Sequence, residues 1–218
     1  LKSIPQMQQE LNYLMNNTEN AVEQIYKIWI KSTLVFLEDE DNRNDLKGAF
    51  GELRAERELR KLPDSYHVLN DFKFKFIKPI YKWDTEECIK GIQVDHTVIG
   101  PTGVFVIETK NWSKSSIDNP EHNSPIDQVN KYGLSLVKLL NNASSLSPAF
   151  KHHWGHQIKI KVHNIVYWPN DKPNVDFPLV KMCGKGELNP FIEGYRLEFD
   201  SKQIQELVVY LLSICKMD

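Results

Sequence analysis

The chain has 218 residues, of which 41% are hydrophobic and 26% are charged, a composition typical of a globular protein and not of a disordered or fibrous one. Its formal net charge of −2 excludes a strong overall attraction to nucleic acid, so any such affinity must come from local patches of Lys and Arg. No apolar run reaches the roughly 18 residues that a membrane span needs.

The cysteines are isolated from one another in the sequence, at Cys88, Cys183 and Cys215. Their spacing contains no CxxC pattern, which argues against a zinc module or a disulfide framework. Cysteines of this kind are typical of a reducing compartment, so we expect a cytoplasmic protein. The chain begins at Leu1 and not at a methionine, and we expect either a trimmed chain or a piece of a longer protein.

A helical arm is predicted at residues 1–42, ahead of a main domain at residues 43–218. Residues 3–38 are helical in pattern, with a break expected near Asn16–Thr18, where Thr18 could cap a second helix.

The apolar residues of the arm recur at helical spacing, which predicts a helix that covers the core of the main domain. A homodimer contact, a contact with a fused or partner domain, and a membrane-surface helix are the alternatives. The acidic and polar stretch Glu38–Asn44 is predicted to be a connector.

The next predicted helix, Asp45–Leu62, contains two glycines, Gly48 and Gly51, directly before Glu52. Glycine inside a helix costs about 1 kcal/mol relative to alanine. A usual compensation is the close approach of another backbone, and small residues surround Glu52 on this helix. The alternative is that Glu52 forms an ordinary exposed ion pair with a basic neighbour on the helix, at Lys47, Arg54 or Arg57.

A half-buried strand is predicted at Tyr66–Ile77 from its alternation of apolar and polar residues. Lysines and aromatic residues in and after this strand could form a basic surface for nucleic acid, although a solvated lysine face is the commoner outcome. The residues concerned are Lys73, Lys75, Lys78, Tyr81, Lys82 and Trp83.

The stretch Gly91–Trp112 predicts a β-hairpin that turns at Gly100–Gly103. In a simple four-residue turn Gly100 pairs with Gly103. A one-residue bulge at Gly103 would instead shift every pair by one residue. Counted outward, the simple turn gives two polar pairs, Asp95 with Glu108 and Gln93 with Lys110. Glu108 and Lys110 share a strand face in either register, because they are two residues apart.

After a polar loop at 111–123, Ser124 and Pro125 are typical of a helix start, and Gln128 and Tyr132 lie one turn apart on that helix. Strands are then predicted at 158–168 and 177–183, and a final helix capped by Asp200 or Ser201. This order predicts an α/β (α+β) domain with a mixed central sheet flanked by helices. The histidines of 151–156 are a weak candidate for zinc, since no second set of ligands accompanies them.

Three motifs in this order resemble the nuclease-related domain (NERD) family of the PD-(D/E)xK superfamily. They are Gly48-Ala49-Phe50-Gly51-Glu52, Gln93-Val94-Asp95-His96, and the run from Gly103 to Trp112 that contains Glu108-Thr109-Lys110. Gln128-Val129-Asn130-Lys131-Tyr132 resembles the QxxxY helix motif of the exonuclease branch. Val94 stands where the motif's name has a proline, whereas the charged residues of the core motif are all present.

The resemblance implies a restriction-endonuclease-like fold and a Mg²⁺-dependent phosphodiester hydrolase, with Mn²⁺ as a substitute cation. It implies Glu52, Asp95, Glu108 and Lys110 as catalytic residues. Metal ligands would be Asp95, Glu108 and the backbone carbonyl of Thr109, and supports would be Gln93, Gln128 and Tyr132. The implied partner is nucleic acid, with DNA as the leading candidate.

Two other interpretations stay open from the sequence. The chain could be a non-catalytic module that binds nucleic acid or a protein partner and keeps the nuclease fold. It could also be a structural domain in which Glu108 and Lys110 form a surface ion pair, which predicts that both point to open solvent, far from Asp95 and Glu52.

Overall fold

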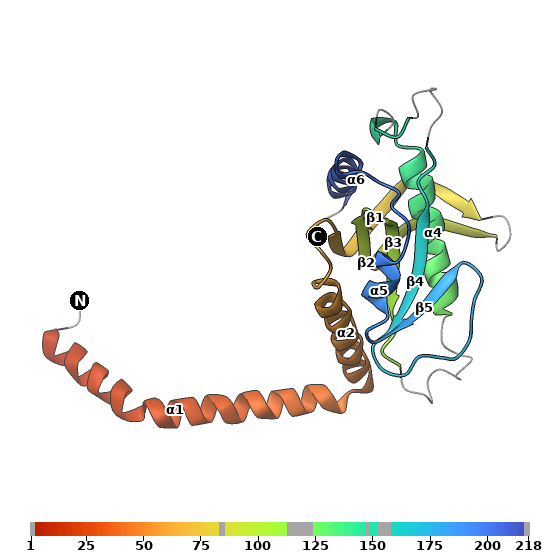
Figure 1. Cartoon of the computed structure of the whole chain (residues 1–218). Coiled ribbons are helices and arrows are strands. Elements are labelled where there is room, and N and C mark those ends of the chain that lie inside the picture. Colours follow the sequence, from red (N-terminus) through yellow and green to blue (C-terminus); the bar gives the residue numbers. More distant parts are fainter. Residues whose placement is uncertain (1–2, 83–85, 113–123, 147–148, 152–157, 216–218) are drawn as a thin grey trace. The chain divides into compact units, whose positions relative to one another are not determined.

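The computed structural model describes residues 3–82, 86–112, 124–146, 149–151 and 158–215 (Figure 1). The chain divides into two compact units, Leu1–Lys47 and Gly48–Asp218. The sequence places the boundary slightly earlier, between residues 42 and 43, and that domain assignment stays a prediction. Within the described ranges, none of the helices is both long enough and apolar enough to cross a membrane.

The first unit contains α1 (Ile4–Glu38), one continuous helix. The predicted break near Asn16–Thr18 was therefore wrong. The side chain of Asn17 donates to the carbonyl of Tyr13, four residues earlier, at 2.8 Å. Asn17 thus bonds within the helix instead of capping a new one, since a single Asn or Thr costs only tenths of a kcal/mol in a helix interior. The prediction that this arm covers the domain core concerns the relation between the units and stays a prediction.

Helix α2 (Glu40–Leu59) begins five residues before the predicted start at Asp45, and the predicted connector at 38–44 was wrong. Asp39 separates α1 from α2, and its side chain accepts a hydrogen bond from the backbone N–H of Asn42 at 3.1 Å. The acidic residues that follow lie in the first turn of α2, where the helix dipole favours negative charge. The polar stretch is a helix start, not a loop.

The second unit is built on a five-stranded mixed sheet flanked by helices, which confirms the predicted fold class, and the strands lie in the order β1-β2-β3-β4-β5. The strands are β1 (His67–Lys82), β2 (Glu87–Gly100), β3 (Gly103–Thr109), β4 (Val162–Trp168) and β5 (Val180–Gly184). The pairs β1–β2 and β2–β3 are antiparallel, and β3–β4 and β4–β5 are parallel. The connection from β3 to β4 runs through α4 (Pro125–Asn141), as a parallel pair requires.

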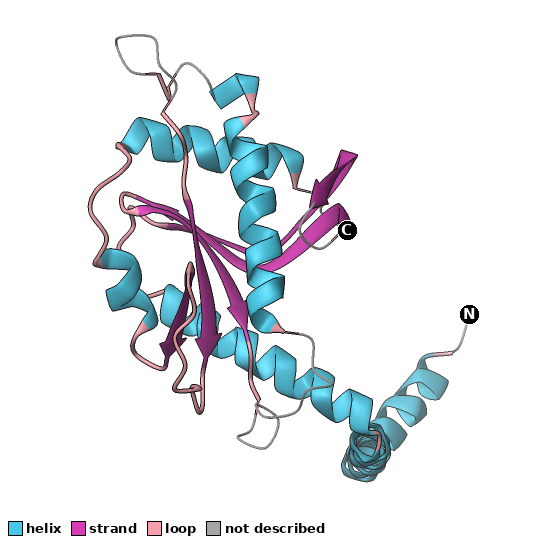
Figure 2. Cartoon of the chain, turned by 90° about the vertical axis from the view of Figure 1, so that its right-hand side faces the viewer, coloured by secondary structure: helices cyan, strands magenta, loops and turns pink. Residues whose placement is uncertain are grey.

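Helices lie on both faces of this sheet (Figure 2). One buried apolar cluster joins the strands to α4 and to α6 (Ser201–Ile214), and the other joins them to the second half of α2 and to α5 (Leu188–Glu193). The single-turn helix η1 (Ser144–Leu146) follows α4. Helix α5 was missed by the sequence, which predicts no helix between the strand at 177–183 and the final helix, because its six residues are too few for a helical pattern.

The hairpin between β2 and β3 has the simple turn, since Gly100 pairs with Gly103 and the register holds to the pair of His96 with Ile107. The two predicted polar pairs, Asp95 with Glu108 and Gln93 with Lys110, both lie beyond this ladder. The N–H of Thr109 instead donates to the Asp95 side chain, and the N–H of Lys110 donates to the carbonyl of Tyr167 on β4.

The ends of three other strands differ from the predictions. Strand β1 continues through Pro79 to Lys82, with a shift of register between Lys75 and Ile80. An edge strand tolerates a proline, which lacks the N–H that a central strand needs. Strands β4 and β5 are shorter at their starts than predicted, by four and three residues.

Candidate active site

Three of the predicted catalytic side chains meet at the end of β3. Glu108 is 1% exposed and its Oε1 lies 2.6 Å from Lys110 Nζ. Asp95, on β2, accepts the backbone N–H of Thr109 at 2.8 Å through Oδ2. The strand alternation therefore places both acids and the lysine together, as predicted. The alternative of a surface ion pair was wrong, because the side chains of Lys110 and Glu108 are only 18% and 2% exposed.

Helix α4 supplies the polar partner of this lysine. Lys110 Nζ donates to Gln128 Oε1 at 3.1 Å, and Gln128 Nε2 donates to the Tyr132 hydroxyl at 2.8 Å. Ser124 caps the helix as predicted, since its side chain accepts the N–H of Asp127. Lys110 Nζ also lies 5.9 Å from the centre of the Trp112 ring. The ammonium group is thus oriented by β3, α4 and an aromatic face at once.

Gly51 allows α2 to approach the end of β3 and so brings Glu52 to the acids. A Cβ atom added at Gly51 would lie 2.7 Å from Asn111 Cβ and 3.3 Å from Thr109 Cγ2. The close approach predicted for the glycines therefore occurs at Gly51, whereas a Cβ at Gly48 would meet none of the described atoms within 4 Å. Glu52 lies within electrostatic range of Asp95 and Lys110.

A chain of side-chain hydrogen bonds, which the sequence did not reveal, holds α2 against this end of the sheet. Arg54 donates to Asn170 Oδ1 at 2.7 Å, and Asn170 Nδ2 donates to Asn111 Oδ1 at 2.6 Å. The three residues are far apart in sequence and belong to no local motif, so periodicity could not find them. Arg54 therefore has a structural partner other than Glu52.

The acids of this site lie in one another's electrostatic field and are partly or fully buried, and both effects change their pKa values. Burial, with the negative charge of Asp95, raises the pKa of Glu108 to about 7, although Lys110 opposes the shift. Burial also raises the pKa of Asp95, although the hydrogen bond from the N–H of Thr109 acts to lower it. The pKa of Glu52 is raised by burial and by Asp95. A positive charge placed beside these acids would therefore stabilise their ionised forms.

Gln93 contacts residues of β1. Its Nε2 donates to Asp71 Oδ1 at 2.9 Å, and it pairs with Lys73 across β1 and β2. Asp71 itself was missed by the sequence, where it is one polar residue in an alternating strand. Its negative charge acts on both Asp95 and Glu52. Its place follows from the register of the sheet and not from the sequence, because Asp71 lies between the pairs of Asn70 with His96 and of Phe72 with Val94.

Comparison with known protein families shows to which family the chain belongs. The model of the family described as "Nuclease-related domain" (NERD) matches residues 47–169, more than half of the 218 residues. The chain belongs to the NERD family. The matched part of this NERD protein runs from α2 to the residue after β4 and includes every predicted site residue.

An uncharacterized protein from Bacillus anthracis is 36% identical to this NERD chain over 96 residues. The alignment covers 35% of the chain and 41% of that relative, so it spans about two fifths of the relative's length.

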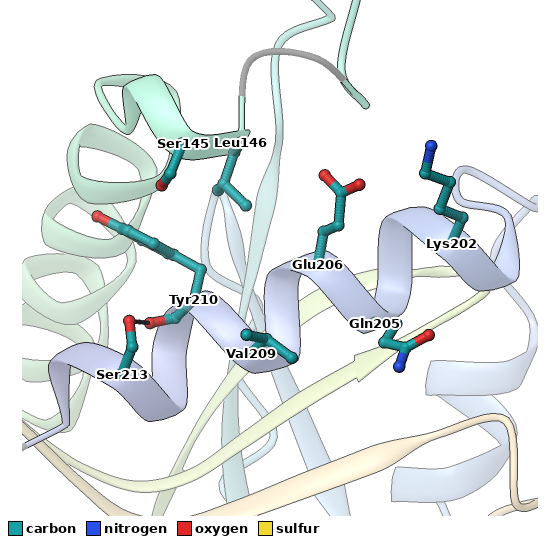
Figure 3. A pocket seen from close by; sticks show the side chains of 8 residues that line it. All are labelled: Ser145, Leu146, Lys202, Gln205, Glu206, Val209, Tyr210 and Ser213. Atoms are coloured by element: carbon teal, nitrogen blue, oxygen red, sulfur yellow. Dashed lines mark hydrogen bonds between the residues drawn. The ribbon is translucent and has the colours of Figure 1, made fainter.

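The NERD chain also has a surface cavity of about 540 Å³ between η1 and α6 (Figure 3). Its lining consists of Ser145, Leu146, Lys202, Gln205, Glu206, Val209, Tyr210 and Ser213. None of the predicted site residues lines this cavity. We place the candidate active site at the acids and Lys110, because buried charge indicates chemistry more directly than surface shape.

Three of the sequence-based predictions fall partly outside the described residues. Those not described are His152, His153 and His156 of the zinc candidate, Trp83 of the basic surface, and residues 113–123 of the predicted polar loop. In the part of the chain that the structure describes, His, Cys, Asp and Glu side chains form no group of three or more able to hold a metal ion.

Proposed function

We propose that this NERD protein is a metal-dependent nuclease of the PD-(D/E)xK type, which hydrolyses phosphodiester bonds of nucleic acid, with DNA as the leading substrate. The observation that carries the proposal is Glu108. Its Oε1 contacts Lys110, while its Oε2 is buried without a hydrogen-bond partner among the described residues. A buried carboxylate oxygen with no partner is costly, unless a ligand completes it.

The oxygens at this position suit Mg²⁺, with Mn²⁺ as a substitute. Asp95, Glu108 and the Thr109 carbonyl would hold it. Magnesium is bound through one or two carboxylates together with water and substrate phosphates, so a pair of acids is sufficient and a cluster of three is not required. When bound, the ion would lower the pKa of a coordinated water and polarise a phosphoryl oxygen.

The protein's own side chains would do the remaining work. Lys110, fixed by Gln128 and Glu108, would orient the attacking water or stabilise the charge that develops on the phosphate. Tyr132 would lie near the substrate and hold Gln128. Glu52 would reach in from α2, as a further ligand or through a water.

Lysines on β1 would supply the phosphate contacts that an acidic protein otherwise lacks. Lys75 and Lys78 are exposed on this edge strand, and Lys73 lies across from Gln93 near the acids. The sequence also offers Lys114 and the stretch 151–163 as basic candidates, parts of which lie outside the described residues.

The test is cleavage of plasmid and single-stranded DNA with Mg²⁺ or Mn²⁺, against the same reactions in EDTA. We expect Asp95→Ala, Glu108→Ala and Lys110→Ala each to lower the rate by at least about 100-fold, the effect of removing one group that stabilises a transition state. Lys172→Ala is the matched control. It removes an ion pair of the same 2.6 Å length that is exposed, and should leave cleavage unchanged.

Equal cleavage by the wild type and all three variants would mean contamination and would refute the assignment. Binding of DNA without cleavage, kept in the double variant of Asp95 and Glu108, would instead support the alternative, a non-catalytic module with a nuclease fold.

A further inference from the structure

Asp71 has an unusual backbone conformation for a residue inside a strand. Its φ is 51°, in the left-handed region, although β1 continues on both sides of it. The flanking pairs, Asn70 with His96 and Phe72 with Val94, keep a single register, so the irregularity is confined to the residue opposite Asp95. Asp tolerates this region better than most residues, but such conformations persist mainly where surrounding structure or function requires them.

The carboxylate of Asp71 holds one donor with each oxygen. Oδ1 accepts from Gln93 Nε2 at 2.9 Å, and Oδ2 lies 3.1 Å from Lys73 Nζ. Lys73 and Gln93 face each other across β1 and β2. Asp71 therefore fixes an ammonium and an amide side by side on two adjacent strands.

This pair lies next to the candidate active site. Asp71 lies between the pairs of Asn70 with His96 and of Phe72 with Val94, which puts it across from Asp95. Gln93 is two residues before Asp95 on β2, so these two residues share a strand face. The electrostatic effect of Asp71 on Asp95 and Glu52 agrees with this proximity. Ammonium and amide groups are the donors with which proteins hold phosphate oxygens.

We propose that Asp71 is a positioning residue that presents Lys73 and Gln93 to a phosphate of the nucleic-acid strand, beside the phosphate that is cut. The effect on cleavage rests on the proposed nuclease function, whereas the effect on nucleic-acid binding does not. Asp71 acts through the two donors and does not touch the reacting atoms. Its left-handed backbone turns the carboxylate to where it can hold both donors.

Two variants separate the carboxylate from the backbone. Asp71→Gly keeps the left-handed conformation and removes the carboxylate. Asp71→Asn also tolerates this conformation and keeps an oxygen for Gln93, but it loses the ion pair with Lys73. Leu179→Gly is the matched control, since Leu179 is also left-handed (φ 64°) and is 89% exposed. Its neighbour Val180 pairs with Asn164, three residues before Tyr167, the β4 residue whose carbonyl accepts the N–H of Lys110.

The experiment measures the Kd of labelled single- and double-stranded DNA in EDTA, by fluorescence anisotropy, and kcat and KM with Mg²⁺. We expect Asp71→Gly to raise Kd and KM about tenfold, the loss of one charge-assisted contact, with kcat changed less than about threefold. Asp71→Asn should raise them about threefold, and Leu179→Gly should not change them.

Three results would overturn the proposal. One is unchanged Kd and KM in Asp71→Gly. Another is a fall of kcat alone, which would make Asp71 part of the chemistry. The third is a loss of Mn²⁺ affinity in Asp71→Gly, measured by electron paramagnetic resonance, which would make Asp71 a metal ligand.

The binding arm also separates the two proposals. A wild-type protein that binds DNA but does not cut it, with binding weakened in Asp71→Gly, would refute the nuclease and support the positioning role. A wild-type protein that neither binds nor cuts would refute both.

Discussion

The two ends of the β2–β3 hairpin treat buried polar groups in opposite ways. At the turn end, Thr102 is 2% exposed, and its hydroxyl donates to the carbonyl of Ile192 at 2.8 Å and lies 3.0 Å from the Tyr66 hydroxyl. At the other end, Glu108 is 1% exposed, and its Oε2 has no partner among the described residues. The turn of the hairpin thus holds a buried hydroxyl with two partners, and its other end holds a buried carboxylate oxygen with none among the described residues.

The difference indicates what each end is for. A buried hydroxyl with two partners contributes to stability, whereas a buried carboxylate without a full set of partners reduces it. Proteins tolerate such destabilising groups mainly where activity needs them. We therefore expect substitutions at the turn end to change stability alone, and substitutions at the acidic end to change activity, even where they stabilise the fold.

The largest effect is expected at the acidic end. Glu108→Gln keeps the shape of the side chain and removes its charge, and should lower the rate of cleavage by at least about 100-fold. Because the pKa of Glu108 is raised from 4.5 to about 7, its ionisation in the folded protein is unfavourable. In EDTA, the variant should therefore gain stability relative to the wild type as pH rises.

The pH window follows from linkage. Between pH 4.5 and 7 the folded wild type keeps a proton on Glu108 that the unfolded chain has lost, so the stability of the wild type falls as pH rises. The variant lacks this slope. Urea unfolding at several pH values measures the difference, and a difference that stays constant from pH 4.5 to 7 would contradict the assigned burial of the charge.

A smaller effect is expected where α2 meets the sheet. Gly51→Ala places a methyl group 2.7 Å from Asn111 Cβ, so either α2 or the residues after β3 must shift, and the position of Glu52 relative to the acids changes. We expect a loss of about 1–3 kcal/mol in the free energy of unfolding and a loss of cleavage of about tenfold, on the order of what a displaced catalytic group causes.

Gly48→Ala is the control within the same helix, since a methyl group there meets none of the described atoms within 4 Å. It should raise stability by up to about 1 kcal/mol through helix propensity, without a change in cleavage. Equal effects of the two substitutions, in thermal melts and cleavage assays, would show that the approach at Gly51 does not position Glu52.

The smallest effect on activity is expected at the turn end. Thr102→Val keeps the volume of the side chain and leaves the Ile192 carbonyl and the Tyr66 hydroxyl without this partner. The free energy of unfolding should fall by about 1–3 kcal/mol, with the cleavage rate of the folded protein unchanged. If cleavage falls while the protein is still folded by circular dichroism, the two ends are coupled and the contrast between them is false.

The sequence predicted the parts of this site that depend on local regularity. Glu108 and Lys110 lie on one face because strand side chains alternate, and Gln128 meets Tyr132 because they are one helical turn apart. The position of the turn at Gly100–Gly103 was also predicted, whereas the choice between a simple turn and a bulge was left open by the sequence and is decided by the pairing in the structure.

The parts that were missed depend on long-range contacts or on weak local preferences. Asn111 meets Asn170 across 59 positions of sequence, and no spacing rule relates them. Asparagine favours loops over helices, yet Asn17 lies inside α1, because the low helix propensity of one residue is too weak to end a long helix. The left-handed backbone of Asp71 could not be seen, because aspartate at a strand position is compatible with ordinary extended geometry.

The outer position of β1 has a consequence for the protein in concentrated solution. An edge strand of 16 residues exposes unpaired backbone groups to which a strand from another molecule can add, and Ile77 on this strand is 100% exposed. Pro79 removes one backbone donor, the register shift between Lys75 and Ile80 distorts the edge, and the exposed charge of Lys78 repels a second copy. The same lysine-bearing edge that we propose to hold nucleic acid would thus also prevent the sheets of neighbouring molecules from aggregating.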